Sequence, residues 1–224
     1  LAEQLYSDFE RAYRENETPG TYSPDAEAAG KRSLRNTCLS YLTATGKANA
    51  IALAKGQFDA SDNMTDCMAA LGVLAHTDCP EREEALRAFH DRWQDDHLVM
   101  DKWFTISASL NSDDIFERLA ALLEHPLFSI KNPNRARALI GAFVSANPGY
   151  FHCATGRGYQ FLAEQIKRLN GINPQVASRL ITPLIQYKEY DVMRQQLMLE
   201  QLKVLRALPH LSRDLLEKLD AALN

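Results

Sequence analysis

The sequence predicts an all-α protein, a superhelical solenoid of antiparallel helix pairs of the HEAT or armadillo type with about a dozen helices. Apolar residues recur at helical spacing along the whole length of 224 residues. Sustained alternation of β-branched residues and Asn-Gly or Asp-Gly turns, which mark strands and hairpins, do not occur. One helix start, NPNRARALI at residues 132–140, returns 41 residues later as NPQVASRLI at residues 173–181, and helix-pair repeats have periods of about 40–47 residues. The alternative, a four-helix bundle, would use fewer and longer helices.

The first two helices are expected near the N-terminus. Residues 1–16 place one apolar residue on each turn of a single stripe, namely Leu1, Leu5, Phe9 and Tyr13. In residues 22–45, Ser23 is the expected N-cap, and Pro24 then occupies the first helical position, where its missing N–H costs nothing. The apolar face of this second helix should consist of Leu34, Cys38, Tyr41 and Leu42.

The remaining helices have similar start and stop signals. Residues 112–126 begin with Ser112 as the expected cap and end at Pro126. Acidic residues at the start of residues 80–93 suit the positive end of the helix dipole. Further helices are expected at residues 63–76, 159–169 and 212–223, the last of them capped by Ser212.

The repeated helix start has a local explanation. Asparagine can cap the helix, and proline suits its first turn. The alanine three residues after each proline, Ala136 or Ala177, keeps the helix slim where a neighbour packs closely, and the Leu-Ile pair faces the core. The arginines, Arg137 in the first copy and Arg179 in the second, are not explained by these demands.

Composition restricts the possible functions. A net charge of −4 without a basic run gives no reason to expect a nucleic-acid partner. The longest apolar runs are far shorter than the about 20 residues of a membrane span, so no membrane contact is expected. The four scattered cysteines, without a CxxC pair, indicate free thiols and a cytoplasmic protein. The first residue is Leu1 rather than Met, already in an amphipathic pattern, which suggests a segment of a longer polypeptide.

Catalytic and metal motifs are absent from the sequence. No two of the six histidines are four residues apart, and His90 and His97 are too far apart for joint ligation on one helix, so no metal site is expected. The FHC triplet at residues 151–153 would need a third, orienting group to act as a thiol–imidazole couple. We interpret the GRGY segment at residues 156–159 as the start of a helix rather than a phosphate loop, and Trp93 and Trp103 as core residues. We therefore assign no catalytic residue.

Arg137 and Arg179 are the candidate binding residues. A cation near a helix N-terminus opposes the helix dipole and is tolerated more easily if an anion or a carbonyl group binds there. Stacked repeats would present both arginines from adjacent positions on one face, which would form a paired anion site.

Four segments resemble the C-terminal domain of the bacterial aminopeptidase N family of zinc-dependent alanyl aminopeptidases. They are KNPNRARALIGAF (131–143), ANPGYFH (146–152), GRGYQFLAEQI (156–166) and NPQVASRLITPLIQYKEYDVMRQ (173–195). The resemblance extends to SLRNTCLSYL and DNMTDCMAAL, and so covers most of the chain.

The resemblance implies that residues 1–224 form a single helical cap domain that closes over an upstream catalytic domain of the same polypeptide. Zinc and the catalytic residues would belong to that upstream domain, and this chain would bind no cofactor and be inactive alone. Arg137 and Arg179 match the arginines of the family that face the cavity, where they would bind the backbone or the C-terminal carboxylate of a peptide substrate. Two alternatives remain: a free-standing HEAT-like interaction module, and a structural domain whose arginines form internal salt bridges.

Overall fold

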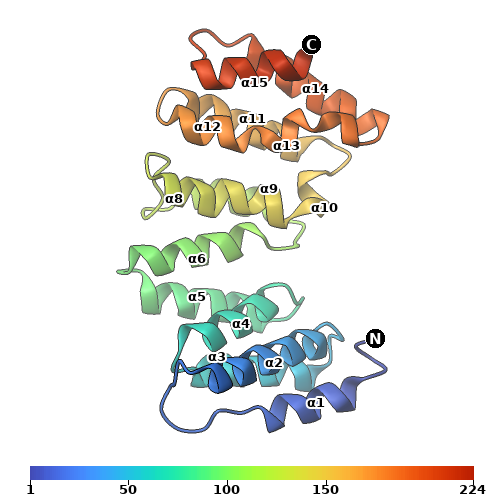
Figure 1. Ribbon diagram of the computed structural model, residues 1–224, viewed down its shortest axis with the longest axis vertical. Coiled ribbons are helices and arrows are strands. Elements are labelled where there is room, and N and C mark those ends of the chain that lie inside the picture. Colours follow the sequence, from blue (N-terminus) through green and yellow to red (C-terminus); the bar gives the residue numbers. More distant parts are fainter. The chain divides into compact units, whose positions relative to one another are not determined.

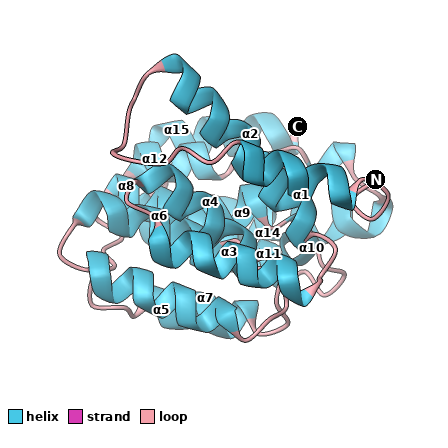
Figure 2. Ribbon diagram, turned by 90° about the horizontal axis from the view of Figure 1, so that it is seen from below, coloured by secondary structure: helices cyan, strands magenta, loops and turns pink.

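The computed structural model describes all 224 residues and consists of helices joined by loops, without a strand (Figure 2). The prediction of an all-α protein is therefore confirmed. The chain folds as two compact units, Leu1–Trp93 and Gln94–Asn224, and the expectation of one domain over residues 1–224 stays a prediction. None of the helices combines the length and the apolar character that a membrane span requires.

The first unit consists of five helices, drawn in blue to teal in Figure 1. They are α1 (Tyr6–Glu15), α2 (Ala26–Thr43), α3 (Ala48–Ala60), α4 (Met64–Ala75) and α5 (Glu81–Trp93). Helix α2 packs against α1 and α4, and α3 and α5 pack against α4. The core between them is aliphatic, and its fully buried members include Leu39, Leu42, Ala54, Leu71 and Leu74.

The start of α2 differs from the expected one. Asp25, not Ser23, is the N-cap, and its carboxylate accepts a hydrogen bond of 2.9 Å from the backbone N–H of Ala28. Ser23 instead donates its hydroxyl to the same carboxylate. A carboxylate is favoured at this position because its negative charge also interacts with the helix dipole.

The apolar faces of α1 and α2 are narrower than expected. Tyr13, Cys38 and Leu42 are buried, whereas Leu1, Leu5, Leu34 and Tyr41 are exposed. Leu1 and Leu5 precede the first residue of α1, so the helical stripe does not include them. The ring of Tyr41 stacks on Phe9 with 4.5 Å between ring centroids, which covers one face of each ring at the surface. Trp93 and Trp103, expected in the core, are only half-buried.

The second unit begins with α6 (His97–Ala108) and α7 (Ile115–Leu123) and continues with a helix in three parts, α8 (Pro133–Ala136), η1 (Arg137–Gly141) and α9 (Ala142–Ala146). The elements after it are α10 (Pro148–Phe151), α11 (Arg157–Asn170), α12 (Pro174–Leu180), α13 (Thr182–Ile185), η2 (Tyr187–Glu189), α14 (Val192–Arg206) and α15 (Arg213–Leu223). The segment η1 is a π-helical turn, which accommodates an extra residue within an otherwise α-helical run.

Helix packing in the second unit follows the order of the chain. Helix α6 packs against α7, η1 and α9, while α11 packs against α12 and α14, and α15 packs against α12 and α14. Ser212 is the N-cap residue of α15, as expected, although its side chain makes no capping hydrogen bond. Ser112 does not cap α7: the helix begins after Asp114, and Ser112 donates its hydroxyl to the Asp114 carboxylate.

An aromatic cluster joins α9, α10 and α11. Phe143, Phe151 and Tyr159 are buried, with ring centroids 6.1 Å apart for Phe143–Phe151 and 5.3 Å apart for Phe151–Tyr159. The rings meet edge to face, the arrangement that their quadrupoles favour. This packing brings the backbone of α10 so close to Gly158 that a Cβ there would lie 2.2 Å from the carbonyl oxygen of Phe151. Only glycine fits at this position of α11.

We therefore expect Gly158→Ala to lower the free energy of unfolding of the second unit by about 3 kcal/mol, because α10 or α11 must shift to admit the methyl group. Urea denaturation followed by circular dichroism measures the change. Gly171→Ala is the matched control, since a Cβ at Gly171 would meet nothing within 4 Å, and it should change the value by less than about 0.5 kcal/mol. Equal stabilities for the two variants would contradict the close approach.

Candidate functional site

Both copies of the repeated motif start helices as the sequence predicts. The Asn132 side chain accepts hydrogen bonds from the backbone N–H groups of Asn134 (3.0 Å) and Arg135 (3.3 Å). The Asn173 side chain accepts one from Val176 (3.2 Å). The prolines occupy the first helical positions. The alanines and the Leu-Ile pairs of both copies are buried, so the structural part of the motif is confirmed.

The two candidate arginines are exposed cations without a counter-ion. Arg137 is the first residue of the π-helical turn, and its only side-chain hydrogen bond, of 3.3 Å, is to the neutral Asn134 side chain. Arg179 lies in the last turn of α12, where the helix dipole favours a cation, so the expectation that it opposes the dipole is wrong. Its side chain is exposed and makes no hydrogen bond and no ion pair. Neither residue forms the internal salt bridge that a purely structural role would require. Both guanidinium groups are therefore available to a ligand.

The helices that carry these arginines touch at Gly141. A Cβ on Gly141 would lie 3.6 Å from Cδ2 of Leu180 and 3.8 Å from Cβ of Arg137. Leu180 follows Arg179 directly, and Arg137 precedes Gly141 by one helical turn. The residue after Arg179 therefore contacts the helix that carries Arg137.

A third arginine in the first motif copy, Arg135, has a different role. It is 2% exposed, and its Nε donates to the Asp101 carboxylate at 2.5 Å. Its other nitrogens donate to the backbone carbonyls of His97 (3.1 Å) and Leu127. Arg135 therefore fixes the start of α8 against α6, and loss of one partner of such a buried pair typically costs about 3–5 kcal/mol. The sequence contains no local signal for this pair, because Asp101 lies 34 residues away.

The FHC triplet does not form a thiol–imidazole couple. The Cys153 thiol lies 3.2 Å from the Thr155 hydroxyl. Nδ1 of His152 lies 2.9 Å from the Tyr159 hydroxyl, and Nε2 lies 3.3 Å from that of Tyr190. Arg194 donates from Nε to the carbonyl oxygen of His152. Burial lowers the pKa of His152, and the charge of Arg194 lowers it further, while burial raises the pKa of Tyr159 to about 12. The His152 ring is thus bonded to two tyrosines rather than to the Cys153 thiol, and the cluster has a structural role.

No three histidine, cysteine, aspartate or glutamate side chains lie close enough to hold a metal ion. His90 belongs to α5 and contacts Asp91, with 3.0 Å between Nδ1 and Oδ1, whereas His97 is the first residue of α6. The helix of His90 ends at Trp93, and Asp96 caps the start of α6. The GRGY segment begins α11, as expected, with Gly156 in the left-handed conformation.

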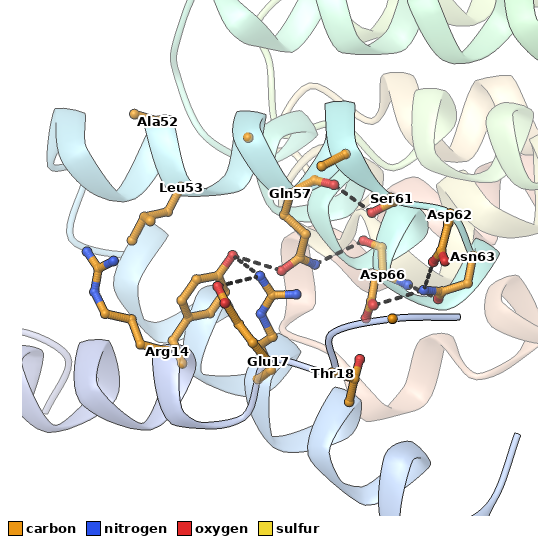
Figure 3. A pocket seen from close by; sticks show the side chains of 15 residues that line it. Arg14, Glu17, Thr18, Ala52, Leu53, Gln57, Ser61, Asp62, Asn63 and Asp66 are labelled. Atoms are coloured by element: carbon orange, nitrogen blue, oxygen red, sulfur yellow. Dashed lines mark hydrogen bonds and ion pairs between the residues drawn. The ribbon is translucent and has the colours of Figure 1, made fainter. Parts of the chain in front are cut away.

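The first unit contains a polar cavity of about 450 Å³ that no sequence motif indicates (Figure 3). Gln57 lines it: the side-chain oxygen of Gln57 accepts from the Tyr13 hydroxyl (3.0 Å), and its nitrogen donates to Asn36 (2.7 Å). Arg35 donates to the same Tyr13 hydroxyl (3.1 Å), and its buried Nε has no partner. These residues come from α1, α2 and α3, so only the tertiary structure assembles the cavity.

The lowered pKa of His152 predicts a pH dependence. Folding favours the neutral ring, so its contribution to stability is complete above the ordinary pKa of 6.5 and is lost as the pH falls through the lower value of the folded state. In urea titrations at several pH values, the free energy of unfolding of the second unit should fall between about pH 7 and about pH 5. The slope should be smaller in His152→Gln. An identical slope in this variant would show that other groups cause the dependence.

A family model described as "Domain of unknown function (DUF3458_C) ARM repeats" matches residues 1–224. Over 223 residues, 100% of the chain, the sequence is 42% identical to aminopeptidase N of Escherichia coli (strain K12) and 41% identical to that of Haemophilus influenzae. Aminopeptidase N of Caulobacter vibrioides is 40% identical over the same length. The chain spans about a quarter of the length of these relatives, 25%, 25% and 26%.

A solved structure shows the same fold. The crystal structure of Legionella pneumophila aminopeptidase A in complex with aspartic acid matches the whole chain with a TM-score of 0.90 and 32% sequence identity, over 27% of its own length. The match to ARM repeats confirms the expected armadillo-type helical fold. The chain therefore belongs to the DUF3458_C family of ARM-repeat domains and is homologous to the C-terminal part of bacterial aminopeptidase N.

Proposed function

We propose that this chain is the C-terminal cap of a zinc-dependent aminopeptidase, which removes N-terminal residues from peptides. The observation that carries the proposal is the 42% identity to an aminopeptidase N over 100% of the chain. In this proposal the cap closes the active-site cavity of an upstream catalytic domain and restricts access to peptides. The protein is cytoplasmic, in keeping with four cysteines that are all free thiols.

The metal belongs to the upstream part of the polypeptide in this proposal. A catalytic zinc site needs three protein ligands, and the structure brings no three suitable side chains together. The residues of this chain would therefore act on the substrate only by binding, orienting and enclosing it.

Arg137 and Arg179 would bind the tail of the peptide. Both are exposed and lack a counter-ion, and their helices meet at Gly141. A guanidinium group offers paired N–H donors that match a carboxylate or neighbouring carbonyl oxygens, which a lysine would match less well. A long substrate would reach these groups, whereas a single-residue amide would be too short.

If zinc and the catalytic residues belong to the upstream domain, the isolated 224-residue chain should not hydrolyse alanine amides, with or without added zinc. The full-length polypeptide should hydrolyse them. A chromogenic alanine amide and a range of zinc concentrations test this directly. Turnover by the purified isolated chain would overturn the proposal. A complete open reading frame that covers only this segment would instead favour a free-standing interaction module.

If these arginines bind the peptide tail, removing one should change KM for long substrates but not for short ones. In the full-length enzyme, Arg179→Ala should raise KM for tri- and tetrapeptides about tenfold, since a hydrogen bond to a charged group contributes about 1.5 kcal/mol. KM for a single-residue chromogenic amide should change little. Arg213→Ala is the control, because this arginine on α15 is 89% exposed and paired with Glu217. Equal effects of Arg179→Ala on long and short substrates would refute tail recognition.

A further inference from the structure

Arg32 of α2 is a buried cation without a counter-ion. Its exposed fraction is 4%, and its side chain makes no hydrogen bond and no ion pair. The ring of Tyr22 faces its charge, with the ring centroid 4.7 Å from Cζ. Hydrogen bonds from Ser23 and from the backbone lower the pKa of Asp25, and the charge of Arg32 also lowers it, although the two side chains form no ion pair. A guanidinium group stays protonated in proteins and carries five N–H donors. None of the Arg32 nitrogens is a fully enclosed atom without a partner, so these donors open onto the cavity that Arg32 lines.

Asp66 of α4 is a buried carboxylate without a cation. Its exposed fraction is 5%, and its oxygens accept only from the neutral side-chain amides of Asn36 (2.8 Å) and Asn63 (3.0 Å). No lysine, arginine or histidine forms an ion pair with it. Amide donors solvate a carboxylate in part, but a buried charge is normally also paired.

These two charges line adjoining cavities within the first unit. Asp66 lines the cavity of about 450 Å³ shown in Figure 3, and Arg32 lines one of about 300 Å³. The two cavities share Glu17, Thr18, Gly20, Asp62 and Asn63. We call this combined space the unit 1 groove. Arg32 and Asn36 are four residues apart on α2, and therefore on one face, and Asn36 holds Asp66. Asn36 thus connects Asp66 to the face of α2 that carries Arg32.

Most other charges of the unit 1 groove already have partners, and the exposed Asp62 accepts a hydrogen bond from the Asn63 side chain. Lys31 pairs with Glu27 at 2.8 Å, Arg35 with Glu17 at 3.4 Å and Arg14 with Glu10 at 2.9 Å. Asp25 is used as the cap of α2. Arg32 and Asp66 are the buried charges that remain. A simple anion would leave Asp66 unpaired, and a simple cation would leave Arg32 unpaired.

We propose that the unit 1 groove binds a small zwitterion with an α-ammonium and a carboxylate group, that is, a free amino acid or a short peptide. The carboxylate pairs with Arg32, and the ammonium group pairs with Asp66. The size of the groove suits such a ligand, because small-molecule sites begin at about 300 Å³. This site is separate from Arg137 and Arg179 of the second unit, and binding to it does not depend on the proposed peptidase function.

Isothermal titration calorimetry on the purified chain tests the proposal with four probes. L-alanine and trialanine carry both charges, and saturable binding of one or the other identifies the source of the zwitterion. Alaninamide lacks the carboxylate and N-acetylalanine lacks the ammonium group, so each should bind at least about tenfold more weakly than the zwitterion that binds. Equal binding of a blocked probe, or no saturation by either zwitterion up to about 10 mM, would overturn the proposal.

Two variants test which residue binds which charged group of the ligand. Arg32→Met should reduce the affinity for the zwitterion to that for alaninamide, and Asp66→Asn should reduce it to that for N-acetylalanine. Arg32→Met removes a buried unpaired charge, so it should fold at least as well as the parent, which circular dichroism confirms even if Asp66→Asn unfolds. Arg11→Met, an exposed arginine paired with Asp8 outside the unit 1 groove, is the control and should bind normally. Unchanged affinity in Arg32→Met would refute the site.

Discussion

The helices of this protein are short, so their stability depends on burying one apolar stripe of each against its neighbours, because isolated helices of this length are marginal in water. In α11, for example, Leu162, Ile166 and Leu169 are fully buried, and α11 packs against α12 and α14. Each buried side chain of this kind contributes about 2 kcal/mol. Many of the contacts between helices join helices that follow one another in the chain. The same local helix start can therefore be used again for a later helix.

A buried charge lowers stability unless it has a partner, and the buried arginines of the two units differ in their partners. In the second unit, Arg135 has a carboxylate and two carbonyl oxygens as partners, so its guanidinium group stabilises the junction between α6 and α8. In the first unit, Arg32 is almost equally buried and has no acceptor at all. The paired charge stabilises the fold, whereas the unpaired one beside a cavity is the group that we propose to bind a ligand.

Structural demands account for most of the repeated motif but not for its exposed arginines. The asparagines cap, the prolines start the helices, and the alanines and Leu-Ile pairs fill the core. Arg137 and Arg179 contribute nothing comparable, since neither is buried or ion-paired. The π-helical turn that begins at Arg137 is a feature often found at functional sites. The proposed binding of a peptide tail would give these cations a role that the fold itself does not.

The sequence alone was sufficient for properties that depend on a single turn of chain: the all-α class, the caps at Asn132 and Asn173, and the family resemblance. The sequence-based prediction was wrong where two nearby residues could both cap a helix, because Asp25 rather than Ser23 is the N-cap of α2. Only the tertiary structure decided which distant groups meet, such as Arg135 with Asp101 and Gly158 with the Phe151 carbonyl. It also decided which charges have no partner. Helical periodicity repeats within a few residues and can be read locally, whereas these pairings depend on how separate helices pack.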